Sequence, residues 1–286
     1  MIIFSTKSAN HITDKINLPK PDYRIEQFSD GELFIKINEN VKGKDVWVIA
    51  STEPPAENLL ELFFLLDTLT YLGTKKINLL FLYFGYARQA IAQHDESHSA
   101  QFICNILKNF KLNKTIIVHA HAFDVLQKFM KVTNVIDFDF FCQVAKNYDA
   151  VAAPDKGAVE FAQKVANECH KEIIFLHKIR PEKDVAKIES IEGNVAGKKI
   201  LLIDDMISTG RTLIEACNEL KRLGALDVSA AATHGVFASG SYERLEDSTL
   251  KNIYVTNTLN RKSQGKIKIV DISKFIENVI SHNPEG

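Results

Sequence analysis

Short apolar runs alternate with longer amphipathic stretches along most of the chain, and no other feature limits the possible folds as strongly. In the stretch 212–223, for example, Leu213, Ala216 and Leu220 recur at the spacing of one helix face. Because the apolar runs are short and alternate with helical patterns, they predict an α/β fold with mostly parallel sheets flanked by helices. We expect strands at 46–51, 76–84, 115–120, 150–154, 172–178, 199–204, 228–235 and 252–258, and helices at 55–72, 97–110, 123–131, 156–169, 212–223 and 272–282.

The length of the chain, 286 residues, predicts two domains, since single domains commonly hold about 100 to 200 residues. We place them at residues 1–142 and 143–286 and expect a cleft between them. Apolar and polar residues alternate around Asp30 and Gly31, which predicts a β-hairpin in the first domain. The segment 181–193 lacks apolar periodicity and is expected to be an exposed, mobile loop of the second domain.

The composition argues against several classes of protein. Charged residues make up 25% of the chain and the formal net charge is −1, so nothing indicates binding to nucleic acid or to a membrane surface. The longest apolar runs, 59–69 and 79–87, fall short of the ~20 residues that span a membrane, and no export signal is visible. The four cysteines, at positions 104, 142, 169 and 217, form no C-x-x-C pair. We therefore expect neither a zinc site nor a disulfide framework, and a cytoplasmic location.

Two adjacent acids, Asp204 and Asp205, end the predicted strand 199–204, and the turn Ser208–Thr212 follows them and leads into a helix. Ligands of parallel sheets bind beyond the carboxyl ends of the strands, and the amino end of a helix favours a phosphate. Gly210 allows the backbone to curl closely, while the acids are suited to a vicinal diol or a divalent cation. Together these groups predict a site for a pentose 5-phosphate; the alternative is a capping turn beside two exposed acids.

The segment 201–213, "LLIDDMISTGRTL", resembles the phosphoribosyl pyrophosphate motif of type I phosphoribosyltransferases and, more closely, of ribose-phosphate pyrophosphokinases. The resemblance to the second family covers nearly the whole chain, with further matches at 28–52, 83–89, 232–237 and 255–259. The short length and the "DDMISTG" form are similar to the archaeal-type branch. This resemblance implies two phosphoribosyltransferase-like domains and an enzyme of nucleotide biosynthesis that uses Mg²⁺. Its reaction would transfer the diphosphate of ATP to the 1-hydroxyl of ribose 5-phosphate, giving phosphoribosyl pyrophosphate and AMP.

The same resemblance implies roles for individual residues. The ribose 5-phosphate site would comprise Asp155, Asp204, Asp205, Ser208, Thr209, Gly210, Arg211 and Thr212. Lys178 and Arg180 would close over the transferring group, and His121 would act beside the phosphates. His121 and Asp155 would also contact the magnesium ion. ATP would be bound by Arg88 and Gln89, and by Phe28, Asp30 and Glu32 of a neighbouring subunit, which implies a homo-oligomer built from dimers.

The residues themselves leave alternatives open. In "YFGYARQ" the aromatic rings offer a stacking surface, Gly85 a close backbone approach and Arg88 a guanidinium group, yet an ordinary strand-end loop would look similar. Lys178 and Arg180 could simply be solvated, Asp155 could cap a helix, and Asp30 could belong only to a turn.

Two departures from the family pattern favour other functions. The chain has Ala90-Ile91-Ala92 where the family usually has acidic and basic residues, and His119 where it has Asp, which suggests a non-catalytic regulatory paralogue. His119 and His121 would share one face of a strand, as in a metal-dependent hydrolase, although no downstream ligand set completes them. A phosphoribosyltransferase is the remaining alternative.

Overall fold

The computed structural model describes residues 1–89, 96–182 and 185–282, and their side chains except those of residue 89 and residues 177–190. The chain divides into two compact units. The first comprises Met1–Ile136 with the segments Thr258–Asn260 and 273–282, and the second comprises Asp137–Asn257 with Arg261–Ile272. The domain limits predicted at 142 and 143 fall inside α5 (Phe138–Ala145). They stay a prediction, because a division by contacts does not test independent folding.

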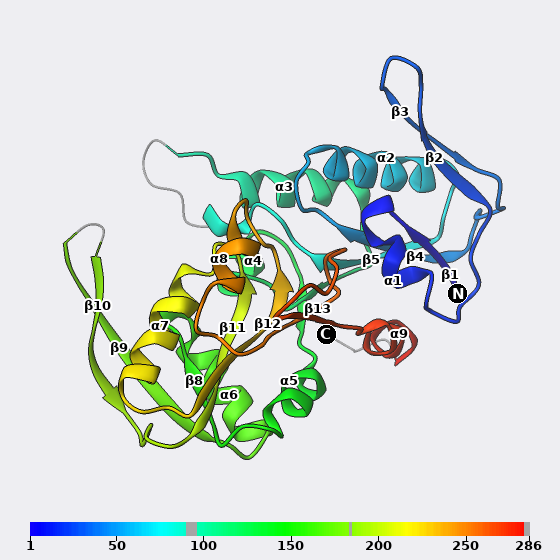
Figure 1. Cartoon of the computed structure of the whole chain (residues 1–286). Helices are drawn as coiled ribbons and strands as arrows, with labels where there is room; N and C mark the ends of the chain where they lie inside the picture. The colour runs from blue at the N-terminus through cyan, green and yellow to red at the C-terminus, as the bar shows by residue number, and fades with distance from the viewer. Residues whose placement is uncertain (90–95, 183–184, 283–286) are drawn as a thin grey trace. The chain divides into compact units, whose positions relative to one another are not determined.

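The first unit contains a five-stranded parallel sheet in the order β1-β4-β5-β6-β7 (Figure 1). Its strands are β1 (Ile2–Ser5), β4 (Asp45–Ser51), β5 (Lys76–Tyr83), β6 (Lys114–Val118) and β7 (Thr133–Val135). The helices of this unit are α1 (Asn10–Thr13), α2 (Glu57–Tyr71), α3 (Ser99–Leu107), α4 (Phe123–Phe129) and α9 (Ser273–His282). Apolar residues of α2, including Leu62, Leu65 and Leu69, are fully buried in one core with Val46 and Val48 of β4. The parallel α/β fold predicted from the alternating pattern is therefore confirmed for this unit.

A separate hairpin consists of β2 (Tyr23–Gln27) and β3 (Leu33–Ile37), which pair antiparallel with Ile25 opposite Ile35. Its turn is closed by two backbone hydrogen bonds, from Phe28 N to Glu32 O at 2.8 Å and from Gly31 N to Phe28 O at 2.9 Å. Gly31 has φ +94°, a conformation that side chains with a Cβ rarely adopt. The hairpin predicted around Asp30 and Gly31 is confirmed.

The second unit contains a seven-stranded sheet in the order β10-β9-β8-β11-β12-β13-β14. Only the edge pair of β9 and β10 is antiparallel. The strands are β8 (Ala150–Ala153), β9 (Glu172–Glu182), β10 (Val185–Glu192), β11 (Lys199–Ile207), β12 (Asp227–Gly235), β13 (Ile253–Thr256) and β14 (Ile267–Val270), and the helices besides α5 are α6 (Val159–Glu168), α7 (Arg211–Arg222) and α8 (Ser241–Glu246). From β8 the chain first adds β9 on one side and then β11 on the other. The direction of winding therefore reverses between β8 and β11.

The segment 181–193 was expected to be an exposed, mobile loop, but its described part is mostly strand, so the expectation of a loop was wrong. β10 runs antiparallel to β9, with Val185 opposite Glu182 and Ile191 opposite Leu176. An edge strand has a neighbour on one side only and can be held by its backbone pairing, so it does not require an apolar pattern. Lys178 and Arg180 lie in β9, with Lys178 opposite Ile188, and their side chains lie outside the part that the structure describes.

The expectation of no disulfide was also wrong. Cys142 of α5 and Cys169 at the end of α6 form a disulfide, with their Cα atoms 5.0 Å apart. The two helices pack together, which brings residues that are 27 positions apart into contact, and sequence spacing cannot show this. Cys104 and Cys217 are free and buried. Within residues 1–89, 96–182 and 185–282, no helix has the length and apolar character needed to cross a membrane.

Candidate active site

The sequence had suggested that Asp204 and Asp205 end their strand. In the structure they lie inside it, because β11 continues to Ile207. β11 continues beside β12 as far as Ile207, opposite Gly235, whereas its pairing with β8 stops at Leu202, opposite Ala152. From Ile203 onward, β11 therefore has no pairing with β8. We call this part of β11 its open edge, and it contains Asp204 and Asp205. This is also where the sheet reverses its winding, the position at which parallel α/β sheets bind ligands.

Three carboxylates interact at this edge. Burial raises the pKa of Asp204 well above its ordinary value, and the negative charges of Asp205 and Asp155 raise it further. The backbone N–H of Asp205 donates to Asp204 Oδ1 at 2.9 Å and offsets part of this effect. A carboxyl group held this way gains from hydroxyl donors or a cation, because either would stabilise its charged form. The site is thus arranged for a ligand that carries such groups.

Asp155 follows β8 and caps the short 3-10 helix η4 (Lys156–Ala158). Its Oδ1 accepts the backbone N–H groups of Gly157 at 2.9 Å and Ala158 at 3.3 Å. The capping interpretation of Asp155 is confirmed, and it does not exclude a second role. The cap uses Oδ1 alone, and the side chain is close enough to Asp204 to influence its charge.

The backbone carbonyl groups of the turn after β11 are fixed by hydrogen bonds from another segment of the second unit. Three successive carbonyl groups, of residues 207, 208 and 209, accept hydrogen bonds from one segment, 237–244. The donors are Phe237 N to Ile207 O at 3.0 Å, Ala238 N to Ser208 O at 3.0 Å, and Arg244 Nη1 to Thr209 O at 2.7 Å. Because the peptide unit is planar and trans, each amide N–H points opposite to the preceding carbonyl. The N–H groups of residues 208–210 therefore face away from this segment, as an anion-binding turn requires.

Gly210 precedes α7 with φ +75°, in the left-handed region. A Cβ atom at this position would lie 2.6 Å from Leu245 Cδ2, so the space beside Gly210 is already filled. The glycine is needed for the shape of the turn and for its packing on α8. Sequence reasoning missed both Arg244 and Leu245, because the only signal was a family resemblance at 232–237, before α8 begins.

Arg211 is the first residue of α7 and is exposed. It lines a groove of about 500 Å³ together with Asn218 of the same helix and Arg244 and Asp247. Its predicted role in substrate binding stays a prediction.

The predicted nucleotide turn at 83–89 differs from expectation in two ways. Tyr83 and Phe84 are buried, with 5% and 3% exposure, so only the half-buried ring of Tyr86, which also packs on the core, keeps an accessible surface. A Cβ atom on Gly85 would lie 2.1 Å from the carbonyl oxygen of Thr52, so this glycine permits contact between protein segments and not an approach to a ligand. Arg88 is exposed on the 3-10 helix η2 (Ala87–Gln89). The departure at 90–92 and the side chain of Gln89 lie outside the described residues.

The predicted pairing of His119 and His121 on one strand face was wrong. β6 ends at Val118, and His119 has φ +42°, which breaks the alternation of side chains. His119 is buried and its backbone N–H donates to Val135 O at 2.7 Å, whereas His121 is half-buried. Among the residues placed by the structure, no cluster of three or more His, Cys, Asp or Glu side chains could hold a metal ion.

The tip of the β2–β3 hairpin is solvent-facing. Phe28 is 55% exposed and stacks on Phe34 with the ring centroids 4.9 Å apart. Asp30 Oδ1 accepts the backbone N–H of Glu32 at 3.1 Å, which confirms its turn role. Asp30 and Glu32 are both exposed, so the three predicted nucleotide contacts lie together on a surface of the first unit.

Comparison with known proteins shows the family of the chain. Residues 1–110 match the family model described as the N-terminal domain of ribose phosphate pyrophosphokinase, and residues 153–285 match the phosphoribosyl synthetase-associated domain. A ribose-phosphate pyrophosphokinase of Fusobacterium nucleatum is 34% identical, covering 97% of this chain and 93% of the relative. One from Thermotoga maritima is 30% identical, covering 98% and 94%. The crystal structure of phosphoribosylpyrophosphate synthetase from Mycobacterium smegmatis aligns with a TM-score of 0.85 and 27% identity over 99% of both chains.

The fold and the acidic strand edge thus define a parallel α/β enzyme. The chain belongs to the ribose-phosphate pyrophosphokinase family. The resemblance found in the sequence is confirmed for the family, while its archaeal-type branch stays a prediction.

Proposed function

We propose that this enzyme transfers the β,γ-diphosphate of ATP to the 1-hydroxyl of ribose 5-phosphate and releases AMP. The observation that carries the proposal is the open edge of β11, where Asp204 and Asp205 lie next to a turn whose amide groups face outward. A pentose 5-phosphate has a diol and a phosphate at the matching ends. The relatives at 30% and 34% identity carry the name of this activity over nearly the same length.

On the sugar side, Asp204 and Asp205 would accept hydrogen bonds from the ribose hydroxyls, while Ser208–Thr212 would bind the 5-phosphate. Hydroxyl donors would favour the ionised form of Asp204, which burial and neighbouring charges disfavour in the free protein. These contacts would offset the effect of burial on Asp204 and fix the sugar with its 1-hydroxyl free to attack.

On the diphosphate side, Arg88 and His121 would contact the nucleotide phosphates, and Lys178 and Arg180 of β9 would approach the transferring group. Removal of one such charged contact commonly slows turnover on the order of 10² to 10³-fold. Asp155 supplies hard oxygen ligands that suit Mg²⁺, whereas the imidazole of His121 is better suited to a phosphate oxygen. When bound, Mg²⁺ would offset the charge on the phosphate oxygens.

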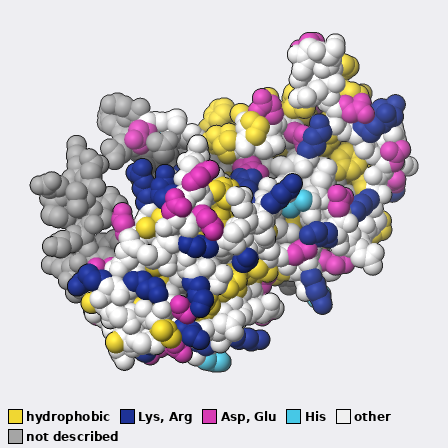
Figure 2. All heavy atoms as spheres, viewed as in Figure 1, with side chains coloured by type: hydrophobic (Ala, Val, Ile, Leu, Met, Phe, Trp, Pro, Cys, Tyr) yellow, Lys and Arg dark blue, Asp and Glu magenta, His cyan; other side chains and the backbone are white. Residues whose placement is uncertain are grey.

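We also propose that the enzyme acts as a homo-oligomer. Hydrophobic side chains gather over α2 and α3 of the first unit (Figure 2), and Leu60, Phe64, Tyr71 and Phe102 are exposed there. Contiguous exposed apolar surface often marks a protein interface. The exposed Phe28 at the hairpin tip is a second such position, and it would reach the nucleotide of a neighbouring subunit.

The deciding experiment incubates the protein with ATP, Mg²⁺ and ribose 5-phosphate and measures AMP and phosphoribosyl pyrophosphate. Lys178→Ala should slow turnover with little change in the KM for ribose 5-phosphate, and Asp205→Asn should raise that KM. Lys36→Ala and Asp139→Asn, at exposed positions of β3 and α5, are the matched controls.

The outcomes separate the alternative functions. A non-catalytic paralogue would release no AMP. A phosphoribosyltransferase would consume phosphoribosyl pyrophosphate with a nucleobase and need no ATP. Equal activity in the wild type and in both site variants would contradict the site assignment.

A further inference from the structure

A second cavity, separate from the acidic site, lies in the first unit beside β1. Its volume is about 300 Å³, which is the size of a small-ligand pocket. Residues 3–25 enclose it, so a single continuous segment of the chain forms all of its walls. Among the described strands β1 pairs only with β4, and the cavity lies along its other edge. The pocket shares β2 with the hairpin whose tip is assigned to ATP, but none of its lining residues is among those assigned to ribose 5-phosphate or ATP.

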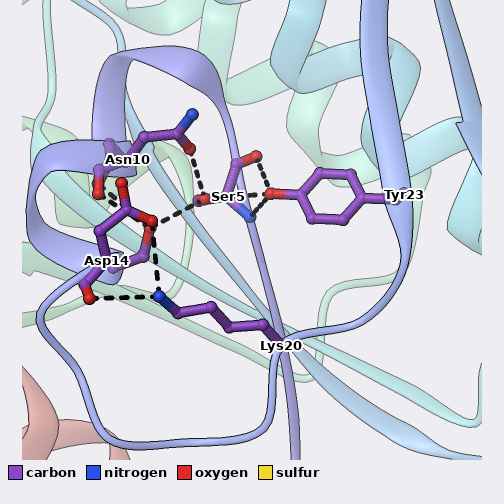
Figure 3. Close-up of polar contacts among 7 residues, drawn as sticks. Ser5, Asn10, Asp14, Lys20 and Tyr23 are labelled. Atoms are coloured by element: carbon purple, nitrogen blue, oxygen red, sulfur yellow. Dashed lines mark hydrogen bonds and ion pairs between the residues drawn. The ribbon is translucent and has the colours of Figure 1, made fainter.

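The polar wall of this cavity is already fixed (Figure 3). The Tyr23 hydroxyl donates to the Ser5 carbonyl at 2.8 Å and accepts the Ser5 N–H at 2.9 Å. Ser5 Oγ donates to Asn10 Oδ1 at 2.8 Å and lies 3.0 Å from Thr13 Oγ1. Tyr23 is further held by an edge-to-face contact with Phe4, with ring centroids 5.1 Å apart. A ligand would thus meet an ordered wall and would not have to organise it.

Donors remain available on this wall. The oxygen of the Asn10 amide is occupied by Ser5, and within the described part of the chain its NH₂ group makes no hydrogen bond. The Lys7 ammonium group forms no ion pair within 4 Å among the described residues; burial raises the pKa of the neighbouring Glu61 carboxyl, and the charge of Lys7 offsets part of that rise. The second lysine, Lys20, lies 3.4 Å from Asp14 Oδ1, and both side chains are largely exposed. Because that pair is neutral as a unit, the lining has one net positive charge, carried by Lys7.

The lining also contains apolar side chains, among them Ile3, Ile16 and Ile25. A ligand that complements both the polar and the apolar part of the lining has a single acidic head and a compact apolar body. We propose that this cavity binds a small organic acid, a carboxylate or a phosphate monoester, with its head on Lys7 and Asn10 and its body on the isoleucines.

The test uses three probes with the same body: butanoate, butyl phosphate and the neutral butan-1-ol, titrated calorimetrically into the full-length protein. Either acid should bind with a Kd on the order of 1 mM, as expected for ligands of about six to nine heavy atoms, and the alcohol should bind at least tenfold more weakly. Binding of butanoate assigns the site to carboxylates, and binding of butyl phosphate alone assigns it to phosphate monoesters.

Variants locate the binding. Lys7→Gln should weaken binding about tenfold, while the control Lys36→Gln, on exposed β3, should not change it. Both variants should melt at the wild-type temperature, because both side chains are exposed. The Asp205→Asn variant of the sugar site should bind the acids as tightly as the wild type does. The proposal is overturned if no probe binds, if the alcohol binds as well as the acids, if Lys7→Gln has no effect, or if Asp205→Asn weakens the binding.

Discussion

Replacing Gly210 by alanine should weaken the second unit through two separable effects. The left-handed backbone, φ +75°, costs an alanine roughly 1 to 2 kcal/mol. The new Cβ would also lie 2.6 Å from Leu245 Cδ2, and overpacking of this kind costs typically about 1 to 3 kcal/mol. The total expected for Gly210→Ala is therefore ~2 to 5 kcal/mol.

A matched glycine separates the two effects. Gly197 has the same φ, +75°, but a Cβ there would meet nothing within 4 Å. Gly197→Ala should therefore cost only the backbone term of roughly 1 to 2 kcal/mol. In a double-mutant cycle, Gly210→Ala combined with Leu245→Ala should be less destabilising than the sum of the single variants by ~1 to 3 kcal/mol, because the smaller side chain makes room.

The assay should follow the second unit directly. The chain has one tryptophan, Trp47, which lies in β4 of the first unit, so its fluorescence would report on the wrong unit. Native-state amide exchange along β11 and α7 measures the opening free energy of the relevant elements. If Gly210→Ala costs no more than Gly197→Ala, or if its effect adds fully to that of Leu245→Ala, the packing argument is refuted.

Three further predictions concern the same unit. Arg244→Ala removes the hydrogen bond to the Thr209 carbonyl. It should raise the KM for ribose 5-phosphate about five- to tenfold, equivalent to ~1 to 1.4 kcal/mol, with kcat little changed. The control Arg222→Ala should leave this KM unchanged. The pKa of Asp204 is raised in the folded state, chiefly by burial, so its stabilising contribution is present below the ordinary pKa of an aspartate and is lost as pH rises through the raised value. Asp204→Asn should therefore raise the melting temperature of the ligand-free protein at neutral pH and weaken sugar binding; a lower melting temperature there would contradict this. Reduction of the Cys142–Cys169 bond, which spans 27 residues, should cost ~3.5 kcal/mol by loop entropy, and Cys142→Ser should show the same loss without reductant.

Much of the fold could be predicted because periodicity depends on local sequence. The apolar strands β4, β5 and β11 and the amphipathic helices α2 and α7 appear within a few residues of their expected bounds. The helix α5, with eight residues, was missed because the domain boundary had been placed within it. The other missed elements are short or lie at an edge: β7 has three residues, β1, β14 and α1 have four each, α8 has six, and β10 has pairing on one side. Such elements have too few residues for a clear pattern, and they are formed mainly by their neighbours in space.

The candidate site likewise has some features that could be predicted from the sequence and others that could not. Asp204, Asp205 and the turn at 208–212 were identified correctly as neighbours of one strand, because they are adjacent in sequence. Their setting was not predictable from spacing. The extension of β11 beyond β8, the closeness of Asp155 to Asp204, and the support of the turn by Arg244 all depend on contacts between distant residues.

By itself, the sequence determined the α/β class and the family, and it predicted the residues of the site, since each of these is read from short local stretches. Only the tertiary structure decided which carbonyl groups are held behind the anion turn, why Gly85 and Gly210 must be glycines, and that Cys142 meets Cys169. The physical reason is common to all three. Steric exclusion, hydrogen bonding and disulfide formation act over a few ångströms. Residues that are far apart in the sequence come within that distance only when the chain folds.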